Sequence, residues 1–120
     1  MQHIGVDIIE IDRIEKLIQR WGKTFLNRVF SRSELEHYSN VSSLAVRFAA
    51  KEAVLKALGA CDKGISWHDI EILAEVNGKP LVNLIGRAKL QAEAAAIKNF
   101  NITLSHSKEY AVAFVVGEKA

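Results

Sequence analysis

Residues 44–58 read LAVRFAAKEAVLKAL, and Gly59 follows them. Alanine and leucine have high intrinsic helix propensity, and a glycine just after a helix readily takes the left-handed conformation that ends it. The stretch therefore predicts a long helix from Leu44 to Leu58. It is the clearest element that the sequence indicates.

A strand pattern lies at the beginning of the chain. Residues 4–11 form an apolar run in which Ile4, Val6 and Ile8 alternate on one face of an extended chain. Asp7 then points to the other face. The run predicts a strand that carries one acid in its middle.

Two further pairs of strand patterns lie in the C-terminal half. The first pair, Ile70–Val76 and Leu81–Ile85, flanks Asn77-Gly78, a dipeptide that favours a two-residue hairpin turn. The second pair, Ile102–Ser107 and Tyr110–Val116, is separated by a short turn and predicts a second hairpin.

Two further helices complete the pattern, a short one and a third long one. One begins at a capping box, formed by Ser31 with Glu34 or by Ser33 with Glu36, and Ser39-Asn40 closes it. The other covers Ala88–Ile97. The order of strand, helices, hairpin, helix and hairpin indicates an α+β fold with a mostly antiparallel sheet and packed helices. At 120 residues, we expect one domain over residues 1–120.

The segment after the first strand predicts an amphipathic helix. Asp12 followed by Glu15 is a helix-start signature, and Gly22 is expected to weaken or end the helix. Apolar residues follow at helical spacing: Ile14, Leu17, Ile18, Trp21 and Phe25. Basic residues occupy another face: Arg13, Lys16, Arg20 and Lys23.

The charge of the chain is unevenly distributed. The formal net charge is +2, whereas residues 13–32 alone carry six basic side chains against Glu15. Such a face is either a solvated surface or a docking surface for an acidic partner. Aromatic residues are 8% of the chain and no RNA-binding signature is present, so a nucleic-acid partner is not expected.

Several classes of protein are disfavoured by composition. The single cysteine, Cys61, cannot form an intrachain disulfide and suits a reducing compartment, so we expect a cytoplasmic protein. No apolar run approaches the roughly 18 residues of a membrane span, and Asp7 and Glu10 interrupt the N-terminal run, so neither a membrane segment nor a signal peptide is expected. The histidines show no zinc-ligand spacing.

Glu52 breaks the pattern of the long helix. On a helical wheel it lies among Phe48, Leu55 and other apolar residues. A buried carboxylate without a partner costs several kcal/mol, so Glu52 must be paired, protonated or bound to a metal. An ion pair with Lys56, four residues later, is the structural alternative.

Asp7 is a second acid in an apolar setting. Gly5, two residues earlier, leaves room above the same strand face. A charge on an edge strand, or a link to a helix N-terminus, is the structural alternative. Two carboxylates on rigid elements, Asp7 and Glu52, also match the ligands that Mg²⁺ takes when substrate phosphates supply further oxygens.

Basic and polar residues near these acids suit phosphate groups. Arg47, Lys51 and Lys56 would form a cationic ridge along the long helix. His106, in the sequence LSHS, has hydroxyl neighbours and could donate to a phosphate, although a structural role is the common one for a lone histidine.

Four stretches of the chain carry a family resemblance: GVDIIEIDRI at 5–14, RFAAKEAVLKALG at 47–59, NGKP at 77–80 and LSHSKEYAVAFVV at 104–116. With them the sequence resembles the holo-acyl-carrier-protein synthases, the short class of 4′-phosphopantetheinyl transferases. The resemblance implies Mg²⁺-dependent transfer of 4′-phosphopantetheine from coenzyme A to a serine of apo acyl carrier protein, releasing adenosine 3′,5′-bisphosphate. It also implies a role in fatty acid biosynthesis.

The resemblance gives the two acids and one lysine a catalytic role. Asp7 and Glu52 match the family's metal ligands, and Lys56 matches the lysine beside the reacting pyrophosphate, where a cation stabilises charge on the phosphates. The base that accepts the serine proton stays open between Glu52 and a metal-bound water.

The resemblance also assigns binding residues. Those matching contacts to coenzyme A, besides Lys56, are Arg47, Lys79, Pro80, His106 and Ser107. Those on or near the family's carrier-docking helix are Arg13, Arg20, Lys23, Phe25 and Arg28. Family members of this length are homotrimers with sites between subunits, so a homotrimer is expected. The competing hypothesis is a non-catalytic basic module that docks acidic proteins or RNA.

Overall fold

The alanine-rich stretch forms the helix α4 (Val41–Leu58) in a computed structural model that describes residues 3–59 and 64–119. The side chain of Asn40 caps its N-terminus by accepting a hydrogen bond from the backbone N–H of Ser43 at 2.8 Å. Gly59, with φ 64°, ends it as predicted. The helix begins at Val41 rather than Leu44 because Asn40, which was expected to close the preceding helix, caps this one instead.

Around α4 the chain forms five strands, four further α-helices and one 3-10 helix within the described residues. In chain order they are β1 (His3–Glu10), α1 (Ile11–Trp21), α2 (Lys23–Val29), α3 (Arg32–His37), then after α4 the 3-10 helix η1 (Trp67–Asp69), β2 (Ile70–Ala74), β3 (Pro80–Leu84), α5 (Gly86–Ala94), β4 (Ile97–His106) and β5 (Tyr110–Lys119). The strands pair antiparallel in two sheets, β1-β5-β4 and β2-β3. The predicted α+β class with antiparallel sheets is confirmed.

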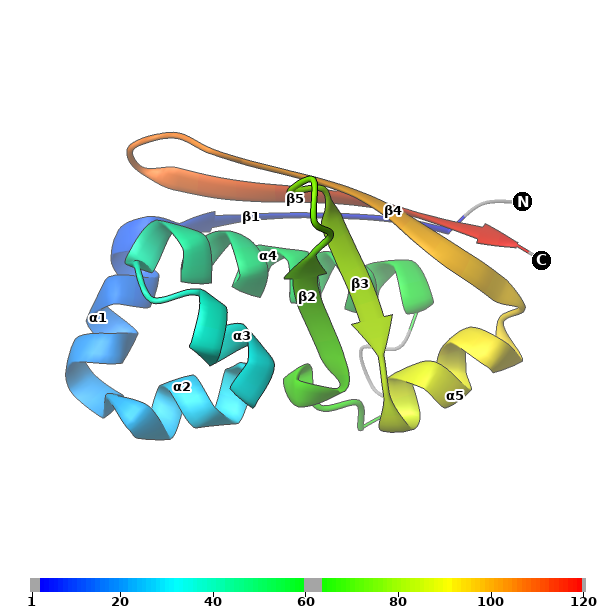
Figure 1. Cartoon of the computed structure of the whole chain (residues 1–120), viewed down its shortest axis with the longest axis horizontal. Helices are drawn as coiled ribbons and strands as arrows, with labels where there is room; N and C mark the ends of the chain where they lie inside the picture. The colour runs from blue at the N-terminus through cyan, green and yellow to red at the C-terminus, as the bar shows by residue number, and fades with distance from the viewer. Residues whose placement is uncertain (1–2, 60–63, 120) are drawn as a thin grey trace.

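The sheet β1-β5-β4 lies along one side of α4, and the remaining elements lie on the other side (Figure 1). Ala111, Ala113 and Val115 on β5 are fully buried and pack in the same core as α4. Gly5 allows β1 to approach the helix closely, because a Cβ at this position would collide with the carbonyl oxygen of Ala53. This close approach sets Asp7, two residues later on β1, against α4.

The outer face of this sheet is apolar. Ile4, Val6 and Ile8 alternate as predicted, but they point away from α4 and are exposed. Phe114, opposite Val6 on β5, is exposed on the same face. In the described part of the chain, helices cover only the other side of the sheet (Figure 1).

The amphipathic helix ends at Trp21, as expected from Gly22, which takes φ 53° where the chain restarts as α2. Other boundaries differ from the predictions. Glu10, not Asp12, is the N-cap of α1. The helix predicted over Ala88–Ile97 begins at Gly86 and ends at Ala94, and Ala96 takes φ 58°, which turns the chain into β4.

The hairpin between β2 and β3 also has a longer connection than predicted. Ala74 pairs with Pro80, and the backbone N–H of Glu75 donates to the carbonyl of Lys79 at 2.8 Å, so Asn77-Gly78 sits within a five-residue connection. The capping box of Ser31 with Glu34 is confirmed at the start of α3. In residues 3–59 and 64–119, no helix is both long and apolar enough to span a bilayer. Cys61 lies outside the described residues.

Candidate active site

Asp7 and Lys56 meet between β1 and α4. Lys56 Nζ donates to Asp7 Oδ1 at 3.0 Å and to the carbonyl oxygen of Val6 at 2.9 Å. The Asp7 side chain is 18% exposed and that of Lys56 is 49% exposed. β1 is an edge strand of its sheet, as the structural alternative supposed, but Asp7 faces α4 rather than open solvent.

Glu52 lies one helical turn before Lys56 on α4. Residues four apart on a helix have Cβ atoms about 5–6 Å from each other, so Glu52 lies next to the Asp7–Lys56 pair. Its partner is the indole of Trp67, whose Nε1–H donates to Glu52 Oε1 at 2.9 Å. The intrahelical Glu52–Lys56 ion pair is not formed, because Lys56 turns to Asp7 instead.

These two carboxylates fit a divalent cation. Asp7 is held on a strand and Glu52 on a helix, and neither is fully buried. Mg²⁺ is commonly bound by one or two carboxylates, with substrate phosphates and water as its other ligands. Within the described residues, no group of three or more His, Cys, Asp and Glu side chains could hold a metal by itself. The donor set therefore suits a cation shared with a phosphorylated substrate.

Lys51 is not part of a cationic ridge, and that prediction is wrong. Its side chain is fully buried, and Nζ donates to Glu34 Oε1 at 2.7 Å, to the carbonyl oxygen of Trp67 at 3.0 Å and to that of Ile70. Burial lowers the pKa of the Lys51 ammonium, and the neighbouring Glu34 carboxylate opposes this shift. The Lys51 ammonium is therefore not accessible to a bound phosphate.

Arg47 lies nearer the start of α4. Its guanidinium stacks on the ring of Tyr38, 3.3 Å from the ring centroid, and donates to the carbonyl oxygen of Ser43 at 3.2 Å. Among the basic residues of α4, only Lys56 is both exposed and beside the two acids.

The other residues matched to coenzyme A contacts lie elsewhere in the chain. His106 and Ser107 are exposed at the β4–β5 turn, and β5 separates β4 from β1, which places these strands about 10 Å apart. The Ser107 hydroxyl accepts hydrogen bonds from the backbone of Glu109 and Tyr110. Lys79 and Pro80 lie at the β2–β3 connection. Within the described part of a single chain, none of these residues forms a hydrogen bond with Asp7 or Glu52.

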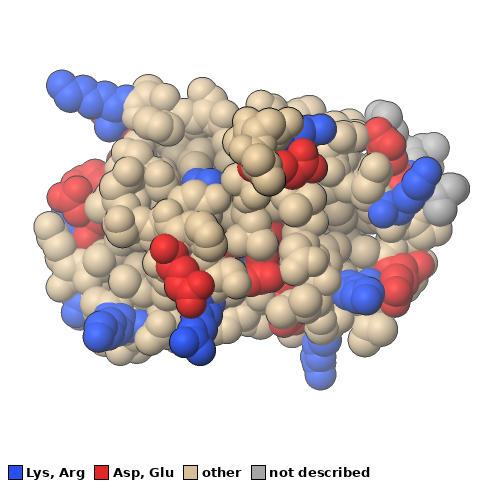
Figure 2. Space-filling view, in the orientation of Figure 1, with Lys and Arg blue, Asp and Glu red and all other residues tan. Residues whose placement is uncertain are grey.

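The basic segment is divided between α1 and α2. Arg13 and Arg20 are exposed on α1, and Lys23 and Arg28 are exposed on α2. Figure 2 shows Lys and Arg side chains along the edge where Figure 1 places these two helices. Acidic residues also lie on α1, since Lys16 pairs with Asp12 at 2.8 Å, so the face is less uniformly basic than the pattern predicted.

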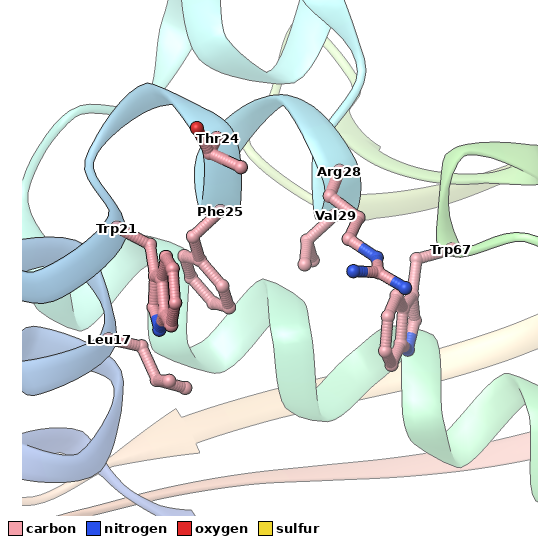
Figure 3. A pocket seen from close by; sticks show the side chains of 7 residues that line it. All are labelled: Leu17, Trp21, Thr24, Phe25, Arg28, Val29 and Trp67. Atoms are coloured by element: carbon pink, nitrogen blue, oxygen red, sulfur yellow. The ribbon is translucent and has the colours of Figure 1, made fainter.

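Phe25 lies beside a pocket at the junction of α1, α2 and η1. The ring is half-buried and packs edge-on against Phe30, with centroids 6.4 Å apart. The pocket has a volume of about 330 Å³. Its walls, shown in Figure 3, are Leu17, Trp21, Thr24, Phe25, Arg28, Val29 and Trp67. An apolar pocket with Arg28 in its wall suits an acidic protein surface with an apolar anchor.

Sequence patterns did not reveal the partners of two α4 residues: Trp67, which contacts Glu52, and Glu34, which pairs with Lys51. Glu34 was identified only as a capping residue, although its carboxylate also accepts from Lys51 and from the backbone N–H of Ile72 at 2.8 Å. Because the helical pattern places Lys51 in a cationic ridge, it carries no signal for a buried partner of this lysine. No signal marked Trp67 either.

Known proteins share this fold and sequence. The model of the 4′-phosphopantetheinyl transferase superfamily matches residues 3–115. A holo-[acyl-carrier-protein] synthase from Dehalococcoides mccartyi is 49% identical over 119 residues, covering 98% of this chain and 99% of the relative, and one from Herpetosiphon aurantiacus is 46% identical over 121 residues, covering 94% and 95%.

Solved structures of proteins with the same name share the fold of this chain. The Helicobacter pylori holo-[acyl-carrier-protein] synthase in complex with coenzyme A is 37% identical with a TM-score of 0.86, covering 96% of this chain and 99% of that one. The Neisseria meningitidis enzyme is 34% identical with a TM-score of 0.89, covering 98% of both chains. The chain therefore belongs to the 4′-phosphopantetheinyl transferase superfamily.

Proposed function

We propose that this chain is a holo-[acyl-carrier-protein] synthase, which transfers the 4′-phosphopantetheine group of coenzyme A to a serine of apo acyl carrier protein at the site of Asp7, Glu52 and Lys56. The observation that carries the proposal is the contact of Lys56 with Asp7 at 3.0 Å, one helical turn from Glu52. Two acids and a cation on rigid elements suit the binding and polarisation of a pyrophosphate.

Asp7 and Glu52 would hold Mg²⁺ together with the pyrophosphate of coenzyme A. The ion supplies positive charge that neutralises the phosphate oxygens. Lys56 is held beside Asp7, where its ammonium can stabilise the negative charge that develops on the leaving phosphate. Its second bond, to the carbonyl oxygen of Val6, limits the positions that the ammonium can take.

The transfer is an in-line substitution at the β-phosphorus of coenzyme A. The serine hydroxyl passes its proton to a base, either the Glu52 carboxylate or a water molecule at the site, as its oxygen bonds to that phosphorus. The bond from the phosphorus to the bridging oxygen breaks, and adenosine 3′,5′-bisphosphate leaves with the bonding electron pair. Because little covalent chemistry falls to the protein, its task is positioning and electrostatic stabilisation.

Intact-mass spectrometry tests the activity. Apo acyl carrier protein incubated with the chain, coenzyme A and Mg²⁺ is expected to gain the mass of one phosphopantetheine, and EDTA is expected to prevent the gain. No gain with several carriers, combined with retained binding to them, would favour a non-catalytic docking module instead.

Acyl carrier protein is proposed to dock on the exposed basic residues of α1 and α2. Arg20→Glu is expected to raise the KM for the carrier about fivefold, because an exposed ion pair contributes up to about 1 kcal/mol, and to weaken its salt dependence. The kcat should stay within about twofold, since Arg20 lies outside the Asp7–Glu52 site. Steady-state kinetics at two salt concentrations measure both effects.

Lys89→Glu is the matched control for this prediction. Lys89 is exposed on α5, at the opposite end of the molecule from α1 in Figure 1. An equal rise in KM for Lys89→Glu would mean that net charge, and not the α1–α2 surface, governs docking.

A homotrimer is proposed to form through the apolar outer face of the sheet. Ile4, Val6 and Ile8 are exposed there beside Phe114, and an exposed apolar face of this kind favours association. Such an assembly would also let His106 and Ser107 of one copy approach the Asp7–Glu52 site of another. Their separation within one chain supports this arrangement.

Phe114→Glu is expected to shift the assembly from trimer to monomer, because it places a charge in an apolar interface. Phe114 is 43% exposed, and Leu90→Glu is the control, since Leu90 is 65% exposed on α5 away from the sheet. Sedimentation velocity measures the mass of the assembly, which is compared with the 13.3 kDa of one chain. A wild-type monomer with full activity would exclude the trimer.

Two further expectations complete the proposal. We place the protein in the cytoplasm, because its single cysteine suits a reducing compartment. We also treat residues 1–120 as one domain, in line with one main hydrophobic core shared by α4 and both sheets.

A further inference from the structure

Trp67 is held at both ends by adjacent residues of α4. The indole Nε1–H donates to Glu52 Oε1 at 2.9 Å, and the main-chain carbonyl oxygen of Trp67 accepts from Lys51 Nζ at 3.0 Å. Lys51 is fixed in turn by Glu34, and both of these side chains are fully buried. The backbone of Trp67 and the hydrogen atom of its indole are therefore anchored to the same helix.

The ring plane of Trp67 is fixed as well. The ring packs against Phe48, one turn before Glu52 on α4, with centroids 5.7 Å apart and planes inclined by 42°. Next along the chain, a ring nitrogen of His68 contacts the carbonyl oxygen of Asn27 on α2. With backbone and ring both fixed, the direction of the Nε1–H donor is fixed.

Trp67 also separates two pockets. It lines the pocket of about 330 Å³ at the α1–α2 end (Figure 3). It lines a second pocket, of about 410 Å³, together with Glu52, Leu55 and Ile65. Arg28 lines both. The indole ring is thus a shared wall, whereas its N–H serves Glu52 alone.

An ionised carboxylate can accept about four hydrogen bonds or metal contacts through its two oxygens. The Trp67 donor on Oε1 restricts rotation of the carboxylate, and among the residues that the structure describes Oε2 has no hydrogen-bond partner. Groups that hydrogen-bond to a metal ligand in this way fix its orientation, and losing such a group commonly costs about 10–100-fold in metal affinity.

We infer that Trp67 is a positioning residue for Glu52: its indole N–H fixes one carboxylate oxygen so that the other is presented to a divalent cation. The inference rests on the proposed function, in which Glu52 holds that cation. The Trp67 side chain then has two roles. Its N–H orients the Glu52 carboxylate, and its ring forms a wall between the two pockets.

Trp67→Phe removes the donor and keeps an aromatic ring against Phe48. Mn²⁺ affinity, measured by EPR of the free ion with coenzyme A present, is expected to fall about 10-fold, the lower end of the effect of losing a partner of a metal ligand. The carrier KM should change less than twofold, because the wall is retained. Trp67→Ala removes the donor and the ring, and it is expected to change both the Mn²⁺ affinity and the carrier KM.

Trp21→Phe is the matched control. Trp21 is 52% exposed and stacks with Arg20, whose guanidinium carbon lies 5.1 Å from the ring centroid. Removing its indole is expected to leave the Mn²⁺ affinity unchanged. A similar loss of Mn²⁺ affinity in Trp21→Phe and Trp67→Phe would overturn the inference, since the loss would then not depend on the contact between Trp67 and Glu52.

The Trp21→Phe chain also allows a test with Trp67 in place. Trp67 is then the only tryptophan, and its indole ¹H–¹⁵N resonance is expected to shift when Mg²⁺ and coenzyme A are added together. The Trp21 resonance of Trp67→Phe is expected to stay in place.

The outcomes separate the inference from the proposed function. If the wild type binds Mn²⁺ and transfers phosphopantetheine while Trp67→Phe binds Mn²⁺ equally well, the positioning role is overturned and the function stands. If the wild type neither binds Mn²⁺ with coenzyme A nor modifies a carrier, both are overturned.

Discussion

Asp7→Asn is expected to lower kcat/KM for phosphopantetheine transfer by more than about 100-fold, beyond the 10–100-fold typical for losing a mere partner of a metal ligand. The amide keeps the shape of the carboxylate but removes its negative charge. Two functions are lost together, because Asp7 is a proposed ligand of Mg²⁺ and also the ion-pair partner of Lys56 at 3.0 Å. Initial rates over a range of Mg²⁺ concentrations measure the effect.

Glu93→Gln is the control for this substitution. Glu93 is an exposed carboxylate on α5, so the same change of acid to amide should leave the rate unaltered. Added Mg²⁺ should restore only part of the activity of Asp7→Asn, because Lys56 still lacks its partner. A rate for Asp7→Asn within about twofold of the wild type would remove Asp7 from the active site.

Lys51→Met is expected to lower the free energy of unfolding by about 3–5 kcal/mol, the usual cost of leaving one charge of a buried ion pair without its partner. Lys51 and Glu34 are both fully buried, and Nζ also serves the carbonyl oxygens of Trp67 and Ile70. Its loss therefore removes the connection between α3, α4 and the start of β2. Urea unfolding at a fixed protein concentration measures the change.

Two variants give this prediction its controls. Lys16→Met, at an exposed ion pair with Asp12, should change the free energy of unfolding by less than about 1 kcal/mol. Glu34→Leu combined with Lys51→Met removes both charges and should recover part of the loss, but not all, since two carbonyl groups lack their donor and the backbone N–H groups of Ser31 and Ile72 lose their acceptor. If Lys51→Met is as stable as Lys16→Met, the buried pair does not support the fold.

Residues that break an apolar pattern were the part of the candidate site that the sequence could bring forward. Asp7 and Glu52 each stand in an apolar run, and burying a lone carboxylate is costly. The structure sets them on β1 and α4 around Lys56. A periodic pattern shows which face of an element is unusual, and here it brings the two acids forward as candidate metal ligands.

The direction of individual side chains could not be predicted in the same way. Lys51 was assigned to a surface ridge, but α3 and β2 cover that side of α4 and bury it. Trp67 meets Glu52 only because the chain returns to α4 through η1, a contact over 15 residues that periodicity does not report. Such contacts follow from tertiary packing.

Element boundaries depended on local backbone conformations that propensity does not capture. The alanine-rich segment after Ala88 favours a helix by composition. The helix nevertheless ends at Ala94, because Ala96 adopts a positive φ and the chain must enter β4 to pair with β5. Gly22 divides the basic segment for a similar reason, with φ 53°.

The most direct test of the proposed site is a crystal of the chain grown with coenzyme A and Mn²⁺, with anomalous diffraction used to locate the manganese. We predict one anomalous peak within bonding distance of the carboxylates of Asp7 and Glu52, in contact with the pyrophosphate of coenzyme A. A peak elsewhere, or coenzyme A bound with its pyrophosphate away from these two residues, would contradict it.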